Sequence, residues 1–261
     1  MKFIFSVIFL LQCFGAEART YYVSLEGSNQ NDGLSIDHAL KSLGRVNQIL
    51  KSLKPGDSLL FRRGDRFHGA LTLAASGSAL APIVIGAYGN GPAPVINGLL
   101  PLSRWTETQP GIFETTLPAA LTRPGVVLIN NQIQRIGRYP NANTANGGYL
   151  SYESHDGFKS ITDKEFASNV DWTGAELVIR KNRWVIDKAK ITRQDGNTFY
   201  YVSPTGQEPT DNFGYFIQND PRTLDQLGEW YYDSASKKLQ IFFGKNPPEK
   251  YAVQAAVIRS L

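Results

Sequence analysis

Residues 55–99, PGDSLLFRRGDRFHGALTLAASGSALAPIVIGAYGNGPAPVINGL, decide the fold that this sequence predicts. Short apolar pairs recur there every 12 residues, with Gly, Ser, Asn and Pro between them; the pairs are Leu59/Phe61, Leu71/Leu73, Ile83/Ile85 and Val95/Ile96. Short strands at even spacing with turn residues between them are typical of a sandwich, a barrel or a β-solenoid. We interpret the stretch as the first strands of a right-handed parallel β-helix.

One amphipathic helix is expected immediately before this stretch. Ser35 is its expected N-cap, and Pro55-Gly56 ends it. A helix in this place would cap the open end of a solenoid, which otherwise exposes apolar core and an unpaired strand edge. The apolar residues follow the i, i+3, i+4, i+7 spacing of one helix face, at Ile36, Leu40, Leu43, Val46, Leu50 and Leu53.

The spacing of the β-prone segments changes after Pro101. Asp195-Gly196 predicts a hairpin turn, and a further hairpin is expected to pair residues 229–232 with residues 239–243. Long strands joined by hairpins favour an antiparallel sandwich. The longer strands are expected at residues 105–117, 126–136, 176–191 and 198–202.

The chain is therefore expected to be mainly β, with an N-terminal cap helix and the first coils of a right-handed parallel β-helix. An antiparallel β-sandwich-like insertion interrupts that helix. The expected parts are a signal peptide at residues 1–18, the cap and first β-helix strands at 19–102, the inserted antiparallel domain at 103–250 and a return to the β-helix at 251–261. The last part ends at Leu261 as if within a strand, so we expect the β-helix to be truncated there.

The N-terminus predicts export from the cell. The apolar run at residues 3–14 is followed by Gly15-Ala16-Glu17-Ala18, an A-x-A-like cleavage site. The mature protein would begin near Arg19 and would be secreted or periplasmic. Cys13, the only cysteine, would leave with the leader, so the mature chain would have no disulfide or thiol chemistry. A lipoprotein anchored through Cys13 is the disfavoured alternative, because the bulky Gln12 precedes the cysteine.

Composition and charge limit the class of protein. With 261 residues, of which 42% are hydrophobic, the chain can bury a substantial core. Its many Gly, Pro and aromatic residues fit a turn-rich β protein. The net charge of +4 is mild and spread along the chain, so it does not predict a nucleic-acid partner, although it is compatible with an acidic polysaccharide.

Several segments of the sequence resemble one family. With the cap helix, they look like the N-terminal region of secreted bacterial right-handed parallel β-helix proteins, the pectate-lyase-like superfamily. Two further segments, Arg138-Tyr139-Pro140-Asn141 and Gly228-Glu229-Trp230-Tyr231-Tyr232-Asp233, look like pieces of the β-rich insertion of some members. The segments of the N-terminal region are Tyr21-Tyr22-Val23-Ser24, Asn31-Asp32-Gly33, Lys54-Pro55-Gly56-Asp57 leading into Leu60-Phe61-Arg62-Arg63-Gly64, and Ile85-Gly86-Ala87-Tyr88-Gly89.

The resemblance implies a carbohydrate-active protein, a polysaccharide lyase or a glycoside hydrolase that binds a glycan along the groove of the β-helix. Catalytic residues of the superfamily usually come from central coils. We therefore expect them beyond Leu261 and expect this fragment to be inactive alone, and we assign no catalytic or substrate-binding residue within it. The expected partner is a polysaccharide, with an acidic one left open, and the expected state is a monomer without a membrane span. No cofactor is identified, and calcium remains open for the full-length protein.

No motif in the chain fixes a reaction. Nucleotide-binding, zinc-hydrolase and serine-esterase motifs are absent from the sequence, and so is a cysteine-based metal pattern. Glu229 and Asp233 are the first carboxylate pair to consider. Along a straight strand they would lie roughly 13 Å apart, beyond the ~5–9.5 Å that glycosidases use.

The remaining polar candidates are expected to have structural roles. Arg138 is expected to pair with a structural acid rather than with a substrate carboxylate. His68 is expected to be a packed or surface histidine, and residues 62–66, with three arginines, a charged turn. The aromatic residues of the hairpin at 229–243 are expected to pack across strands rather than to bind sugar. Three neighbouring polar residues are expected to form a turn rather than a calcium site, namely Asn29, Asn31 and Asp32.

Two other functions stay open on the sequence. The first is a non-catalytic extracellular β-helix protein that binds glycan or acts as an adhesin. The second is a complete carbohydrate-binding unit in the 261 residues.

Overall fold

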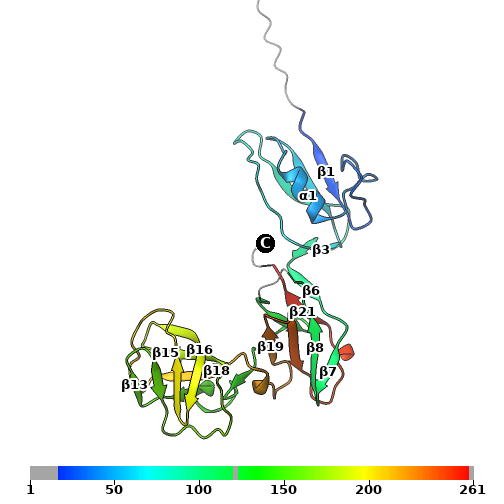
Figure 1. Cartoon of the computed structure of the whole chain (residues 1–261). Helices are drawn as coiled ribbons and strands as arrows, with labels where there is room; N and C mark the ends of the chain where they lie inside the picture. Colours follow the sequence, from blue (N-terminus) through cyan, green and yellow to red (C-terminus); the bar gives the residue numbers. More distant parts are fainter. Residues whose placement is uncertain (1–16, 120–122, 259–261) are drawn as a thin grey trace, which may run out of the picture. The chain divides into compact units, whose positions relative to one another are not determined.

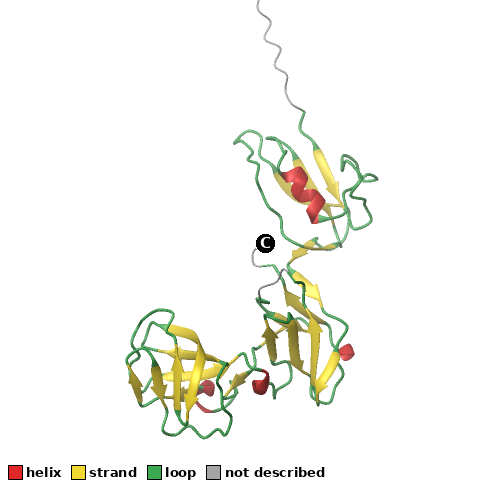
Figure 2. Ribbon diagram, in the orientation of Figure 1, coloured by secondary structure: helices red, strands yellow, loops and turns green. Residues whose placement is uncertain are grey.

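The computed structural model describes residues 17–119 and 123–258. The chain forms two compact units, the first ending at Gly98 and the second beginning at Leu99. Strands are the main regular structure of both units, and the described residues contain a single α-helix (Figures 1 and 2). The apolar run of the expected signal peptide, with Cys13, lies outside the described residues.

The first unit contains two small parallel ladders of strands. One has the order β1-β2-β4 and the other pairs β3 with β5. Within β2, Leu59 and Phe61 point into the core, so Leu60 and Arg62 face outward. The elements of this unit are β1 (Thr20–Val23), α1 (Leu43–Leu50), β2 (Ser58–Arg62), β3 (Arg66–His68), β4 (Val84–Tyr88) and β5 (Val95–Asn97).

The regular spacing of 12 residues is wrong in one of its four segments. Leu71 and Leu73 belong to no strand, because the chain from 69 to 83 is an irregular loop with Gly at 69 and 77 and Pro at 82. The parallel pairs are also spaced more widely than 12 residues: Ser58 pairs with Val84, 26 positions later, and Arg66 pairs with Val95, 29 positions later. The 12-residue spacing combined β2 and β4, which belong to one ladder, with β5, which belongs to the other. Two parallel ladders are shown, and a complete β-helix is not.

The helix is shorter than the apolar spacing predicted, and Ser35 is not its N-cap. Helix α1 begins after Ser42, whose Oγ accepts a hydrogen bond from the backbone N–H of Arg45 at 3.3 Å. Leu40 pairs instead with β1, because its N–H donates to the carbonyl of Tyr22 and its carbonyl accepts from Ser24. The buried side of α1 packs against the core that includes Leu59 and Phe61. The helical face starting at Ile36 was therefore wrong for its first two turns.

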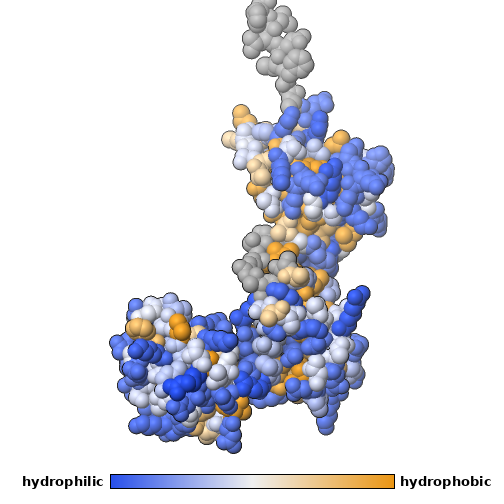
Figure 3. All heavy atoms as spheres, viewed as in Figure 1, coloured by the Kyte–Doolittle hydropathy of each residue, from blue (hydrophilic) through white to orange (hydrophobic). Residues whose placement is uncertain are grey.

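The edge strand β4 leaves part of that core exposed. Among the described residues β4 pairs with β2 on one side only. Ile85 lies in register with the fully buried Leu59, yet it is 40% exposed. Figure 3 shows hydrophobic residues on the visible face of this unit amid a mostly hydrophilic surface.

The sheets of the second unit are antiparallel, as the sequence predicted for the insertion. Three of the expected long strands are in fact hairpins, because turn residues interrupt them; Asn130 and Asn131 adopt positive φ angles of 51° and 62° between β9 and β10. The turn at Asp195-Gly196 is confirmed, since it joins β16 to β17. The hairpin of β19 and β20 is also confirmed.

The second unit has two hydrophobic cores, and different sheets pack around each of them. An eight-stranded sheet has the order β11-β18-β15-β16-β17-β14-β13, with β12 also on β18, and it encloses a core around Trp172 and Phe199. Two four-stranded sheets, β10-β9-β21-β6 and β19-β20-β8-β7, enclose a core around Trp230 and Phe243. The buried aromatic residues of β19 therefore pack within the protein, as expected.

The strands and 3-10 helices of the second unit follow in chain order. They are β6 (Leu99–Pro101), β7 (Thr106–Gln109), β8 (Ile112–Thr116), β9 (Val127–Ile129), β10 (Gln132–Gln134), β11 (Arg138–Tyr139), η1 (Ala145–Gly148), β12 (Leu150–Ser151), β13 (Ser154–Asp156), β14 (Ser160–Thr162), β15 (Glu176–Arg180), β16 (Ile186–Asp195), β17 (Thr198–Tyr201), β18 (Gly214–Gln218), η2 (Pro221–Thr223), β19 (Trp230–Asp233), β20 (Lys238–Phe242), η3 (Pro248–Lys250) and β21 (Val253–Ala256).

The stretch from residue 251 differs from its expected return to a parallel β-helix. Strand β21 pairs antiparallel with both β6 and β9, in the register Val253 to Ile129. Val253 and Ala255 are buried in the same core as Trp230. The alternation of apolar residues was correct for a strand, but alternation does not distinguish a parallel partner from an antiparallel one. No helix of the described residues has the length and apolar character needed to cross a membrane.

Candidate functional site

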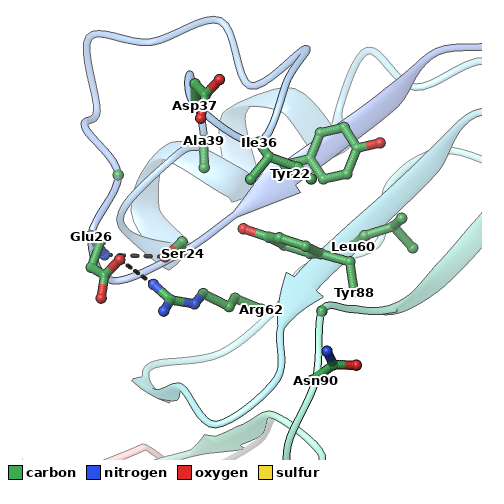
Figure 4. Close-up of a pocket in the computed structure, with 12 residues that line it drawn as sticks. Tyr22, Ser24, Glu26, Ile36, Asp37, Ala39, Leu60, Arg62, Tyr88 and Asn90 are labelled. Atoms are coloured by element: carbon green, nitrogen blue, oxygen red, sulfur yellow. Dashed lines mark hydrogen bonds and ion pairs between the residues drawn. The ribbon is translucent and has the colours of Figure 1, made fainter.

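The first unit carries an open cavity of about 720 Å³ on the outer face of its three-stranded ladder. Figure 4 shows the cavity between the strands and the loop that connects β1 to α1. The side chains that matter for its chemistry are Tyr22, Glu26, Asp37, Arg62, Tyr88 and Asn90. Its volume falls within the ~300–1,000 Å³ typical of small-molecule sites.

Strand alternation places the floor of this cavity. Because Leu59 and Phe61 face the core, the next outward positions of β2 are Leu60 and Arg62. In the parallel register Leu60 lies beside Tyr22 of β1, and Arg62 lies beside Tyr88 of β4. The fold thus gathers two aromatic rings and one guanidinium on one face.

The two tyrosines form an edge-to-face pair. Their ring centroids lie 5.1 Å apart with an interplanar angle of 86°, a geometry that favours the positive edge of one ring against the face of the other. Partial burial raises the pKa of Tyr88, and a hydrogen bond with Ser24 opposes that rise. Figure 4 shows the Tyr88 ring lying across the cavity with its hydroxyl directed toward Ser24. Both rings are half-buried, so they are held in place without being sealed from solvent.

The charged group at the cavity is an ion pair between Arg62 and Glu26. Hydrogen bonding to Glu26 and the charge of that carboxylate raise the pKa of Arg62. The side chains remain 39% and 77% exposed, so a ligand could reach both. Asp37 extends from the loop on the opposite side of the cavity (Figure 4). The site therefore carries two carboxylates and one cation.

Short contacts fix the loop that carries Glu26. The backbone N–H of Leu25 donates to Asp65 Oδ2 at 2.8 Å, and the N–H of Ser28 donates to the carbonyl of Ala39 at 3.0 Å. Gly27 is needed here, because a Cβ at this position would collide with the Ala39 carbonyl oxygen. The loop is thus held at both ends next to the strands.

The cavity presents several kinds of group that a polar ligand can contact. Glu26 is engaged with the Arg62 guanidinium. Within 17–119 and 123–258, no group of three or more His, Cys, Asp or Glu side chains could hold a metal ion. What the cavity offers is ring surface, charged donors and charged acceptors, all open to solvent.

The structure does not bring Glu229 and Asp233 together as a catalytic pair. Glu229 Oε2 accepts hydrogen bonds from the N–H groups of Asp225 and Gln226, both at 3.2 Å. Burial raises the pKa of Glu229 to about 7. Asp233 instead holds the hairpin turn, since its carboxylate accepts from the Ala235 N–H and the Ser236 hydroxyl. Each carboxylate has a local structural task.

Arg138 does not meet the structural acid that the sequence predicted. Its Nε donates to the carbonyl of Pro140 at 3.0 Å and its Nη2 donates to the carbonyl of Gly148. The guanidinium lies 3.6 Å from the centre of the Phe216 ring, a cation–π contact. Burial lowers the pKa of Arg138. Carbonyls and aromatic rings thus take the place of an acid.

The three turn residues and His68 have the structural contacts expected of them. Asn29 Oδ1 accepts from the Ser42 N–H, Asn31 Nδ2 donates to the Ala39 carbonyl, and Asp32 Oδ1 accepts from the Leu34 N–H. His68 Nδ1 lies 3.0 Å from Asn97 Oδ1 across the parallel pair of β3 and β5.

Sequence reasoning missed the cavity because it took residues 62–66 as one charged turn. Arg62 is the last residue of β2 and belongs to the outward face of the sheet, whereas Asp65 fixes the loop. The signal was present: Leu60 and Arg62 are two positions apart, and so are Tyr22 and Ser24. What was missing was the register that brings these strands together.

A buried polar cluster of the second unit was also missed. Lys181 Nζ lies 2.7 Å from Asp187 Oδ2 and donates to Ser203 Oγ at 2.5 Å and to the Gln207 carbonyl at 2.6 Å. The hydroxyl of Thr205 donates to the same carboxylate oxygen at 2.9 Å. Burial acts to raise the pKa of Asp187, but the bonds from Lys181 and Thr205 outweigh it and the pKa lies below its ordinary value. Nothing in the spacing of these residues predicts their contact.

Comparison with known proteins finds relatives among enzymes that act on carbohydrates. A lacto-N-biosidase of Bifidobacterium longum subsp. longum is 43% identical over 74 residues, which are 27% of this chain and 5% of that protein. A solved structure described as a glycoside hydrolase superposes with a TM-score of 0.70 over 94% of this chain, at 16% identity, which is a likeness of fold. No family model matches the chain.

A solved lacto-N-biosidase of family GH136 from Eubacterium ramulus shares 43% identity over 32% of this chain and 14% of its own, with a TM-score of 0.29. The chain thus spans a small part of the curated relative it matches and about half, 47%, of the superposed glycoside hydrolase.

Proposed function

We propose that this chain is the N-terminal part of a secreted carbohydrate-active enzyme, with glycoside hydrolysis as its reaction. The observation that carries the proposal is the agreement of two independent likenesses. The sequence is 43% identical to a lacto-N-biosidase over 74 residues, and the fold resembles a glycoside hydrolase over 94% of the chain. Hydrolysis is favoured over lyase chemistry because both relatives are named for hydrolytic enzymes.

The architecture proposed for the whole enzyme is a right-handed parallel β-helix that continues from the first unit. Strands β1, β2 and β4 add to one parallel ladder, while β3 and β5 begin a second one. The exposed Ile85, on the core side of β4, is the surface that a further parallel strand would cover. Export through the leader at residues 1–18, to the periplasm or the medium, belongs to the same proposal.

The catalytic residues are proposed to lie outside these 261 residues. A glycosidase needs two carboxylates flanking the scissile bond, about 5–9.5 Å apart. Two buried carboxylates, Glu229 and Asp187, are committed to backbone or lysine contacts. The glycan and its linkage are left open by this proposal, as is a calcium requirement.

The test is to express the reading frame extended beyond codon 261 and to assay the product on a panel of glycans that includes substrates ending in lacto-N-biose. Release of a reducing sugar without an unsaturated product is the expected result. A folded extended protein that cleaves no glycan of the panel would count against the enzyme. An unsaturated uronate product would replace hydrolase by lyase.

A non-catalytic glycan-binding protein is the second candidate. The observation in its favour is the cavity of the first unit, which has ring surface and charged hydrogen-bonding groups. It predicts saturable glycan binding without turnover by the extended protein.

A further inference from the structure

We infer that the cavity at Tyr22, Tyr88, Arg62 and Asp37 is a binding site for a neutral saccharide and discriminates against uronic acids. The inference builds on the proposed function, because it names the kind of glycan that one particular site would hold. It assigns a binding site to the first unit.

The charges at the cavity argue for a neutral ligand. The one cation, Arg62, is already paired with Glu26, and Asp37 adds a second carboxylate across the cavity. A ligand carboxylate would share the Arg62 guanidinium with Glu26, whose negative charge would repel it, and would also face Asp37. Like charges lining the same cavity disfavour the binding of a ligand carboxylate. A hydroxyl group meets no such penalty.

Hydrogen-bonding capacity at the cavity matches sugar hydroxyls, which both donate and accept. Arg62 has five N–H donors, and the ion pair with Glu26 engages only some of them. Asp37 accepts hydrogen bonds only, while the amide of Asn90 can do both. Hydrogen bonds to charged groups are about twice as strong as neutral ones.

Ring surface supplies the apolar part of the site. Tyr88 lies across the cavity and is braced by the edge-to-face contact with Tyr22 (Figure 4). An amphipathic ring that is fixed in advance contributes contact area at little cost in conformational entropy. The loop of Glu26 is held by Asp65 in the same way, so binding would not have to order it.

The test measures the affinity of the chain for three neutral probes, cellohexaose, xylohexaose and mannohexaose, and for hexagalacturonate, by calorimetry at moderate salt. We expect saturable binding of at least one neutral probe and weaker or no binding of hexagalacturonate. Tyr88→Ala and Asp37→Ala should each weaken neutral binding by about tenfold or more. If Tyr88→Ala does not fold, Asp37→Ala, on an exposed loop, still decides the matter.

A matched control uses Trp184, an aromatic side chain of the second unit that is 88% exposed. Trp184→Ala should leave neutral binding unchanged, because exposure of a ring alone does not make the proposed site. Glu26→Gln should strengthen hexagalacturonate binding, because it removes a negative charge beside Arg62 and leaves the guanidinium to pair with a ligand carboxylate.

The inference is overturned if no neutral probe binds, if hexagalacturonate binds the unchanged chain more tightly than every neutral probe, or if only Trp184→Ala abolishes binding. The proposed function fails separately. An extended protein that cleaves a glycan while this cavity binds none would leave the enzyme proposal standing and remove the site.

Discussion

Each unit contains an ion pair between a basic and an acidic side chain, Arg62–Glu26 in the first and Lys181–Asp187 in the second. The two pairs differ in their exposure to solvent and in how many hydrogen-bond donors of the basic residue are used within the protein. Arg62 and Glu26 are 39% and 77% exposed, whereas Lys181 and Asp187 are 0% and 1% exposed. The buried lysine also donates to Ser203 and to the Gln207 carbonyl, so its hydrogen-bonding capacity is fully used within the protein. The exposed arginine keeps unused donors facing a cavity.

This difference teaches that composition does not separate a binding site from a structural cluster. Both sites contain a basic residue, an acidic partner and a nearby tyrosine. In the buried cluster this is Tyr201, whose ring centre lies 5.4 Å from Lys181 Nζ. Desolvation makes the buried pair costly to break, because the remaining charge cannot return to water. The exposed pair contributes little to folding and can exchange partners. The expected effects of substitutions follow this order.

The largest effect on stability is expected for Lys181→Met. The substitution leaves Asp187 buried without its cation, and the expected loss in the free energy of unfolding is about 3–5 kcal/mol. Urea denaturation followed by circular dichroism measures it. The control is the double variant Lys181→Met/Asp187→Leu, which should be more stable than the single one because no buried charge remains. A single variant as stable as the double variant would contradict the structural role of the pair.

The next effect is a pH dependence that arises from Glu229. Burial raises the pKa of Glu229 to about 7 in the folded protein, above the ~4.3 of an unfolded chain. The folded state therefore binds the proton more tightly, and this contribution is complete below about pH 4 and is lost as the pH rises through about 7.

When the pH rises from 5 to 8, we expect the ionisation of Glu229 to lower the free energy of unfolding by roughly 2 kcal/mol. Urea denaturation at the two pH values measures the change. Glu229→Gln, which keeps an oxygen for the N–H groups of Asp225 and Gln226, should reduce it. An unchanged pH dependence in this variant would assign the effect to another group.

A smaller pH effect is expected from His155. Hydrogen bonding to Asp211 at 2.5 Å raises its pKa, and burial opposes this while Glu208 at 3.3 Å adds to it. The stability it contributes is present below its ordinary pKa near 6.5 and is lost as the pH rises through the higher folded value. These side chains are partly exposed, so we expect less than about 1 kcal/mol.

Denaturation of His155→Gln across pH 5.5 to 8.5 measures this smaller effect. The variant should lose stability at the acidic end of the range and should match the unchanged chain at the alkaline end. Equal losses at both ends would point to packing rather than to charge.

The smallest effect is expected in the first unit. Glu26→Gln and Arg62→Met should leave the denaturation midpoint unchanged, because the pair is open to solvent. The same measurement as for Lys181→Met gives a direct contrast between the two pairs. A clear loss of stability in Arg62→Met would make the exposed pair structural and would erase the comparison.

The sequence predicted the type of most strands and the antiparallel character of the second unit, because alternation and turn residues are local signals. The hairpins at Asp195-Gly196 and at β19–β20 are examples. It failed where a tertiary contact overrode a local pattern. Leu40 fits a helical face but pairs with β1, and Val253 fits a solenoid strand but joins an antiparallel sheet.

Prediction of the candidate site from the sequence required knowledge of tertiary contacts to a greater extent than prediction of the strands did. Tyr22, Arg62 and Tyr88 come from three strands, and only the parallel register places them on one face. The turn-forming role expected of Asp32 could be predicted, because its contact with the N–H of Leu34 is local. The ring partner of Arg138 could not, since Phe216 is distant in sequence, whereas its carbonyl partners Pro140 and Gly148 lie within ten residues.

The most direct test of the account locates the bound sugar by NMR. The ¹⁵N- and side-chain ¹³C-labelled chain is titrated with the neutral hexasaccharide that binds most tightly. The account predicts that chemical-shift changes concentrate at Tyr22, Arg62 and Tyr88 in the first unit, while Lys181 and its neighbours in the second unit do not change. Changes confined to the second unit, or centred on Trp184, would contradict it.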